Sequence, residues 1–168
     1  KLDTKTRKKA FDQLFKATII PFFEKEGFVS VSKTSKKLSK SFLNGLSVYI
    51  YFEYKTFGSG FYDLTIAYFD DEVGNEIDDE YLVHPKLSTP KLKYGTTEDL
   101  TSNNGAEWLE EIQQKVIPFI KNHATHKAIL ISDKFYYSSS REKQAKEILH
   151  KKAQINNQWK QLKYFFLQ

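Results

Sequence analysis

The sequence predicts a single α+β domain spanning residues 1–168, in which helices pack on an antiparallel meander sheet. Three stretches carry apolar residues at helical spacing, at about 4–26, 104–123 and 139–167. Between the first two, apolar and polar residues alternate along a sheet core of about 28–69. The links between these strands are too short for parallel crossovers, so the sheet should be antiparallel.

The first predicted helix gathers its apolar residues on one face, which should pack against the sheet. Asp3 or Thr4 can cap its start, and Gly27 is a natural stop. Pro21 has no amide hydrogen, so it should kink the helix or mark a break in it. The apolar stripe consists of Phe11, Leu14, Phe15, Thr18, Ile19, Phe22 and Phe23.

The longest predicted strand follows Asn44-Gly45, a pair that favours a tight hairpin turn. A short strand at 41–43 should precede this turn, and another should lie at 28–32. One face of the long strand is apolar, and we expect it to contact the first helix and the helix around Trp108. That face consists of Leu46, Val48, Ile50 and Phe52.

The middle of the chain alternates between strands and loops. A five-residue connection at 56–60 should lead into a strand over 61–69. The acidic block at 70–80 should be a solvated loop. Residues 81–101 contain two prolines and predict a long irregular loop with at most one short strand. Residues 128–132 predict a further strand.

Two helix starts are marked later in the chain. Asn104 with Glu107, and Ser139 with Glu142, have the spacing of capping pairs. In the last helix the apolar residues repeat at alternating four- and three-residue steps, with Lys152 in one slot. Such a narrow seam suits packing along another element or a partner helix. The seam consists of Ile148, Ile155, Trp159, Leu162 and Phe166.

Composition excludes several classes of protein. The chain has no cysteine, which rules out disulfides, a thiolate nucleophile and cysteine-ligated zinc. No apolar run approaches the roughly 20 residues of a membrane span, so we expect no membrane partner. The net charge is +5 and the pI about 9.1, but the only arginines are Arg7 and Arg141. Because lysine lacks arginine's forked geometry, this charge indicates nucleic-acid binding only weakly.

Several loose motifs follow one another over about residues 8–123. They are Ile20-Pro21-Phe22-Phe23, Gly27-Phe28, Ser41-Phe42, Gly58-Ser59-Gly60-Phe61 and a later helix containing Pro118. In these motifs the chain resembles a bacterial family catalogued as domain of unknown function 4304. The resemblance implies a soluble bacterial α+β domain, and it implies neither an activity nor a functional residue.

The sharpest candidate chemistry lies on the hairpin that the 56–60 connection closes. If that connection is symmetric, Glu53 faces Asp63 across the sheet and Lys55 projects on the same face. Two acids and a lysine are the ingredients of a magnesium-dependent nuclease site. The alternative is a solvated face with a lysine between two acids. We favour this alternative and expect no divalent metal, because no further acid or phosphate cradle is evident nearby.

Four aromatic residues share the less apolar face of the predicted sheet, namely Tyr49, Tyr51, Phe61 and Phe69. If exposed, they would form a platform able to stack bases or grip a peptide. If covered by the third helix, they are core residues. We favour the covered arrangement, because the seam of that helix needs a partner surface.

The histidines indicate no metal centre. His123 and His126 have a spacing that zinc tolerates, but no further ligand pattern completes a site. We interpret these two, with His84 and His150, as surface or capping residues. The acidic block lacks the alternating ligands and central glycine of a calcium loop. No phosphate-binding loop, dinucleotide motif or nucleophile elbow occurs, so we expect no cofactor.

The favoured function is a cytoplasmic, non-enzymatic protein-interaction or regulatory module of bacterial immunity type. Its support is the lack of a catalytic constellation, the many aromatic residues and the segregation of charge. Lysines cluster at 5–9 and 33–40, whereas acids cluster at 70–80. The alternative is a nucleic-acid-binding or metal-dependent nuclease domain, which the basic pI supports. Because the chain begins at Lys1 rather than methionine, a removed leader also stays open.

Overall fold

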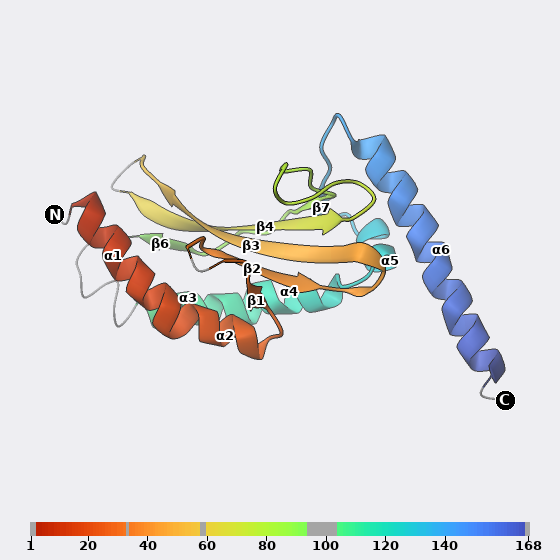
Figure 1. Ribbon diagram of the computed structural model, residues 1–168, viewed down its shortest axis with the longest axis horizontal. Helices are drawn as coiled ribbons and strands as arrows, with labels where there is room; N and C mark the ends of the chain where they lie inside the picture. The colour runs from red at the N-terminus through yellow and green to blue at the C-terminus, as the bar shows by residue number, and fades with distance from the viewer. Residues whose placement is uncertain (1–2, 33, 58–59, 94–103, 167–168) are drawn as a thin grey trace. The chain divides into compact units, whose positions relative to one another are not determined.

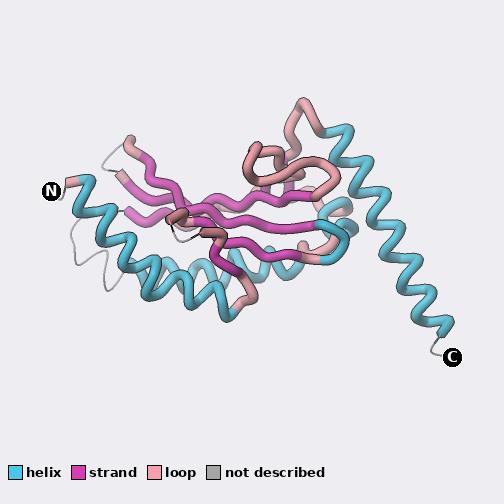
Figure 2. Tube along the Cα trace, in the orientation of Figure 1, coloured by secondary structure: helices cyan, strands magenta, loops and turns pink. Residues whose placement is uncertain are grey.

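The computed structural model describes residues 3–32, 34–57, 60–93 and 104–166. It confirms the predicted α+β class, with a five-stranded antiparallel meander sheet in the order β1-β2-β3-β4-β6 and helices packed on it (Figures 1 and 2). The strands are β1 (Val29–Ser30), β2 (Lys37–Ser41), β3 (Leu46–Lys55), β4 (Phe61–Asp70) and β6 (Lys91–Lys93).

Internal contacts divide the chain into two compact units, each discontinuous in sequence. Unit 1 comprises Lys1–Lys40, Tyr49–Ile66 and Leu87–Phe119. Unit 2 comprises Ser41–Val48, Ala67–Lys86 and Ile120–Gln168. Strands β3 and β4 contribute residues to both units, so the same two strands supply the core of each.

The Asn44-Gly45 turn forms as predicted, but the strand before it lies earlier than expected. Asn44 has φ 61° and ψ 35°, and Gly45 has φ 78°. These values match the two central residues of the hairpin turn whose twist suits antiparallel strands. The amide of Leu46 donates to the carbonyl of Leu43, which makes Leu43 the first turn residue. The predicted strand at 41–43 is therefore wrong, and β2 ends at Ser41.

Each of the two long helices that include a proline contains a π turn placed just before it. In the first, α1 (Thr4–Leu14) passes through η1 (Phe15–Ile19) into α2 (Ile20–Lys25). In the second, α3 (Asn104–Glu111) passes through η4 (Ile112–Val116) into α4 (Ile117–Asn122).

The π turns explain how both helices continue across their prolines. Pro21 and Pro118 lack an amide hydrogen, and their rings would clash with the carbonyl four residues back. The residue before each proline instead donates to the carbonyl five residues back, Ile20 to Phe15 and Ile117 to Ile112. The wider turn accommodates the ring, so the predicted interruption at Pro21 takes the form of a π turn.

In unit 1, helices α1 and α3 lie along one face of the sheet, as predicted (Figure 1). The alternate residues Leu46, Val48, Ile50 and Phe52 are all buried, the first two within unit 2 and the last two within unit 1. The ring of Phe52 lies 6.2 Å from that of Phe11 and 5.3 Å from that of Trp108. Both predicted helices therefore contact the predicted sheet face.

Unit 2 contains α5 (His126–Leu130), β7 (Phe135–Tyr136), α6 (Glu142–Phe166) and β5 (His84–Pro85), which pairs with β7. The strand predicted at 128–132 is wrong. Thr125 caps a helix there by accepting a hydrogen bond from the amide of Ala128 at 3.1 Å. The irregular loop predicted at 81–101 is also wrong in part, because β5 and β6 both lie within it. Residues 94–101 are outside the described residues.

The predicted seam of the last helix is not the buried face of its described part. Ala145, Leu149, Lys152 and Ala153 are buried, whereas Ile148 is half-buried and Phe166 is exposed. Helix α6 packs along α5. The side chains of Ile155, Trp159 and Leu162 lie outside the described residues, as does that of Asn104, the predicted cap. Among the described helices, none has the length and apolarity to cross a bilayer.

Candidate anion-binding site

Three lysines line a cleft in unit 1. Lys5, Lys8 and Lys9 stand on one side of α1, because residues three and four apart share a helix face. The cleft has a volume of about 590 Å³. Helix α1 also contributes Asp12, and the loop before β2 contributes Lys36. The remaining walls are Phe52, Tyr54 and Tyr62, which come from strands β3 and β4.

The positions of these lysines oppose the local preferences of a helix. Cations in the first turns interact unfavourably with the helix dipole, and like charges four residues apart repel each other. At this end of the helix Asp3 offsets part of the positive charge. Its Oδ1 accepts a hydrogen bond from the amide of Thr6 at 2.7 Å. Residues that break local rules without a compensating gain are expected at functional sites.

The cleft has an excess of positive charge. Asp12 forms ion pairs with Lys36 at 3.1 Å and with Lys16 at 3.3 Å. The hydrogen bond from Lys36, followed by that from Lys16, lowers the pKa of the Asp12 carboxyl despite its partial burial. Among the described residues, no carboxylate pairs with Lys5, Lys8 or Lys9. An anion entering the cleft therefore meets three exposed ammonium groups.

An aromatic surface accompanies these charges. The Nζ of Lys8 lies 5.1 Å from the centroid of the Tyr54 ring, the geometry of a cation–π contact. The ring centroids of Tyr54 and Tyr62 lie 5.2 Å apart in an edge-to-face arrangement, and Tyr62 stacks on Phe11 with the centroids 3.7 Å apart. Burial, with a smaller effect from Asp12, raises the pKa of Tyr62 to about 12. Tyr62 is thus neutral, and it supports the half-buried ring of Tyr54.

The predicted trio of Glu53, Lys55 and Asp63 also lies in unit 1. The Nζ of Lys55 is 2.7 Å from the Oε2 of Glu53, and this hydrogen bond, with a smaller effect from Asp63, raises the pKa of Lys55. The hydroxyl of Thr89 donates to Asp63 at 3.4 Å. Among the described residues, no group of three or more metal-ligating side chains is arranged around a common point. The expectation that no divalent metal binds here stays a prediction.

The predicted aromatic face is divided between the units. In unit 1 the half-buried rings of Tyr49 and Tyr51 lie 6.2 Å apart, with the Nζ of Lys37 5.6 Å from Tyr51. Phe61 is also half-buried, whereas Phe69 belongs to unit 2 and is buried there. Because Glu53 and Asp63 share the unit 1 face, its charges nearly balance. The cleft has an excess of lysine, so it suits an anion better than this aromatic face does.

The interpretation of His126 as a surface or capping residue is wrong, because Thr125 is the cap, and so is the assignment of Asp70 to a solvated loop. Both side chains are fully buried in unit 2. Asp70 is the last residue of β4, on the core side that alternate strand residues share. His126 is the first residue of α5. Its Nε2 lies 2.6 Å from the Oδ2 of Asp70. Because an ionised carboxylate can only accept, the Nε2–H group is the donor of this hydrogen bond.

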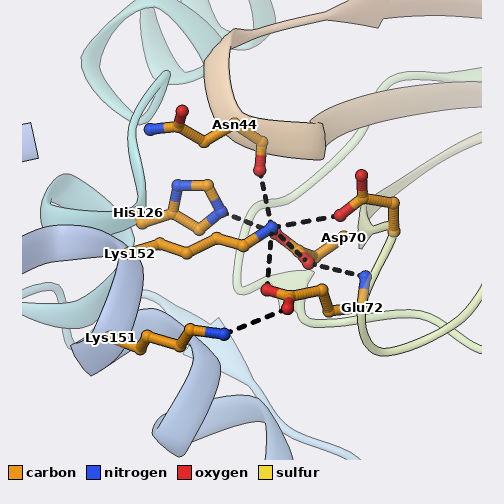
Figure 3. A network of polar contacts seen from close by, with 7 residues as sticks. Asn44, Asp70, Glu72, His126, Lys151 and Lys152 are labelled. Atoms are coloured by element: carbon orange, nitrogen blue, oxygen red, sulfur yellow. Dashed lines mark hydrogen bonds and ion pairs between the residues drawn. The ribbon is translucent and has the colours of Figure 1, made fainter. Parts of the chain in front are cut away.

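Lys152 joins this pair into a network of polar contacts (Figure 3). Its Nζ lies 2.6 Å from the carbonyl oxygen of Asn44 and 3.0 Å from each carboxylate oxygen of Asp70. It is also 3.0 Å from Asp71 and 3.3 Å from Glu72. The left-handed turn at Asn44 directs that carbonyl to the ammonium.

The network binds segments together and leaves little capacity for a substrate. Both oxygens of Asp70 are engaged, since Oδ1 also accepts from the amide of Glu72 at 2.9 Å. The ammonium of Lys152 has three protons shared among several oxygens. Contacts from Lys152 reach residues 82 and 108 positions away in sequence. We interpret the network as a structural link, within unit 2, between the hairpin turn, the end of β4, α5 and α6.

The network predicts how stability depends on pH. Burial raises the pKa of the Asp70 carboxyl, but hydrogen bonds from His126, the Glu72 amide and Lys152 outweigh it and hold the pKa below 3.8. Burial lowers the pKa of Lys152, but Asp70 and Asp71 outweigh it and hold the pKa above 10.5. A depressed carboxyl pKa adds stability that is lost as the pH falls through it. A raised ammonium pKa adds stability that is lost as the pH rises through it.

We therefore expect urea-unfolding stability to be level in the neutral range and to fall in acid and in strong alkali. The acid loss should be smaller in Asp70→Asn, and the alkaline loss smaller in Lys152→Met. If both variants keep the full pH dependence of the wild type, the network does not control it.

Part of the site could have been found from sequence. The spacing of Lys5, Lys8 and Lys9 alone predicts one charged helix face. Lys152 was visible as a charge in an apolar seam, but its partners lie in distant segments. Lys36 is visible only as one of the lysines clustered at 33–40, and Tyr54 and Tyr62 carry no signal of their own.

Comparison of the chain with protein-family models, with curated proteins and with solved structures finds no match. The resemblance to the 4304 family therefore stays a prediction.

Proposed function

We propose that this chain is a non-enzymatic binding module that holds an anionic polymer in the unit 1 cleft. The observation that carries the proposal is the exposed face of Lys5, Lys8 and Lys9, for which no described carboxylate is a partner. These lysines line a concave surface with Tyr54 beneath Lys8. This proposal favours the nucleic-acid-binding alternative of the sequence over cleavage.

The chemistry of the cleft supports binding rather than catalysis. A catalytic site needs an acid or base within reach of the substrate. Among the described residues of the cleft, the single carboxylate is Asp12, and two lysines hold it. Lysine binds phosphate as a point charge, without the directional fork of arginine. Such contacts recognise a charged backbone rather than a sequence.

A salt series tests the proposal. The affinity for inorganic polyphosphate, measured by titration calorimetry, should fall steeply as salt rises, because bound lysines release counterions. Three contacts to a single-stranded polyanion give a slope of log K against log salt of about −2, at roughly 0.7 per contact. Absence of binding at low salt, or binding that salt does not weaken, would contradict the proposal.

The protein-interaction or immunity-type module stays a second proposal, in which the partner is a protein. Its support is the segregation of charge along the chain and the exposed Val29 on the edge strand β1, which is 61% accessible. Edge strands with exposed apolar residues are common contact surfaces. Recovery from a bacterial host of one acidic protein that competes with polyphosphate would favour this second proposal. A cytoplasmic location likewise stays a prediction.

A further inference from the structure

A second cavity in unit 1 shares two residues with the cleft. Its volume is about 440 Å³, and Asp12 and Lys36 belong to the lining of both. The walls of the second cavity differ in chemistry from the cleft. They combine the apolar side chains of Phe15 and Ile20 with hydroxyl groups from the end of β1 and the segment after it, including Ser30 and Thr34.

The ion pair between Asp12 and Lys36 stands where the two cavities meet. Lys36 is 3.1 Å from Asp12, and Asp12 keeps a second partner in Lys16 at 3.3 Å. A ligand phosphate can therefore replace Asp12 as the partner of Lys36, because the Asp12 carboxylate keeps its ion pair with Lys16. Without ligand, the Asp12 carboxylate thus occupies the position beside Lys36 that a ligand anion would take.

The two cavities together offer three kinds of surface in a row. The cleft presents ammonium groups beside the Tyr54 ring, the boundary presents Lys36, and the second cavity presents hydroxyls beside an apolar wall. A ligand that fits this order carries alternating negative charges, sugars and flat rings. We infer that the anionic polymer is single-stranded nucleic acid, with a base stacked on Tyr54, a phosphate at Lys36 and the next nucleotide in the second cavity. This inference rests on the proposed function and adds the class of ligand.

Two competing ligands fit the surfaces less well. In a duplex the faces of each base are covered by its neighbours, so Tyr54 would have no ring to stack on. An acidic peptide supplies charge, but it does not supply a ring and a sugar at every repeat. In the absence of ligand the ammonium of Lys8 covers the Tyr54 ring, and a phosphate would draw it away as a base arrives.

The test compares two single strands of equal length and charge with a duplex of the same length, which carries about twice their charge. Fluorescence anisotropy would measure the affinity of the full chain for an eight-residue oligothymidylate, for an abasic oligomer of the same length, and for an eight-base-pair duplex. Base stacking is expected to make oligothymidylate bind about tenfold more tightly than the abasic oligomer. In Tyr54→Leu this ratio should fall to near one, and Tyr54→Phe, which keeps the ring, should restore it.

A matched control exists in unit 2, where the Nζ of Lys86 lies 5.0 Å from the ring of the exposed Tyr136. Tyr136→Leu removes the same kind of lysine–tyrosine contact outside the cleft, so the ratio should stay near tenfold. Equal wild-type affinity for oligothymidylate and the abasic oligomer, or tighter binding of the duplex than of oligothymidylate, would overturn the inference while leaving polyanion binding intact. Tighter binding of polyglutamate than of oligothymidylate would overturn it in favour of an acidic protein. If polyphosphate also fails to bind, the proposed function is wrong as well.

Discussion

Replacing Lys152 with methionine is expected to lower the free energy of unfolding by about 3–5 kcal/mol, the usual result of breaking a buried ion pair from one side. Methionine keeps the length and apolar stem of lysine, so packing within α6 is preserved. The loss arises because the fully buried carboxylate of Asp70 keeps its charge without its ammonium partner. Urea unfolding followed by far-ultraviolet circular dichroism would measure it.

Two further variants distinguish the cost of an unpaired buried charge from the general effect of replacing a lysine in this helix. Adding Asp70→Asn to Lys152→Met should recover part of the loss, because the neutral amide no longer needs a cation and its oxygen still accepts from His126. Lys151→Met is the matched control, since Lys151 is an exposed neighbour that pairs with Glu72 at 3.1 Å. Its effect should be small. Equal losses in Lys151→Met and Lys152→Met would show that the buried network has no special role.

Reversing the charge of Lys8 and Lys9 together is expected to abolish most polyanion binding. The variant Lys8→Glu, Lys9→Glu removes two phosphate contacts and adds two repulsive charges. Each lost contact reduces the slope of log K against log salt by about 0.7, so the slope should shrink from about −2 to about −0.6. Affinity at low salt should fall by at least about tenfold, because both contacts and the steering field are lost. Calorimetric titration with polyphosphate measures both quantities.

The same variant should not weaken the fold. Acids near the start of a helix interact favourably with its dipole, and loss of the repulsion between Lys5 and Lys9 offsets the new repulsion between the acid at position 8 and Asp12. The melting temperature should therefore hold or rise. The control is Lys134→Glu, Lys143→Glu, which changes the net charge equally at two exposed lysines of unit 2. If this control weakens binding as much as the cleft variant does, the effect reflects net charge and not the cleft.

The sheet was predictable wherever a local rule and the burial pattern agreed. Asn44-Gly45 required a tight turn, and the alternation through β3 required one buried face. The helix α5 was mistaken for a strand because periodicity cannot distinguish the two over a short apolar run. The capping residue Thr125 favours a helix over a strand at this position. The short strand β6 forms by pairing with β4, a long-range effect that a local pattern does not carry.

The sites were less predictable because their residues converge from distant segments. Asp70 was assigned to a loop from the acids that follow it, although strand alternation places it on the core side. Its partner Lys152 lies 82 residues away. In the cleft, the helix face of Lys5, Lys8 and Lys9 is local and readable. Tyr54 joins it only once the pairing of helix and sheet is known.

The two π turns have a consequence for how the long helices follow the sheet. Their buried residues recur every four positions, a spacing that would drift by about 40° per repeat around an ideal helix of 3.6 residues per turn. A π turn holds more residues than an α turn, so it rotates the later half back into phase. Each proline therefore lies just beyond the point where the phase is reset. The stripes kept in line are Phe11, Phe15, Ile19 and Phe23 in one helix, and Trp108, Ile112, Val116 and Ile120 in the other.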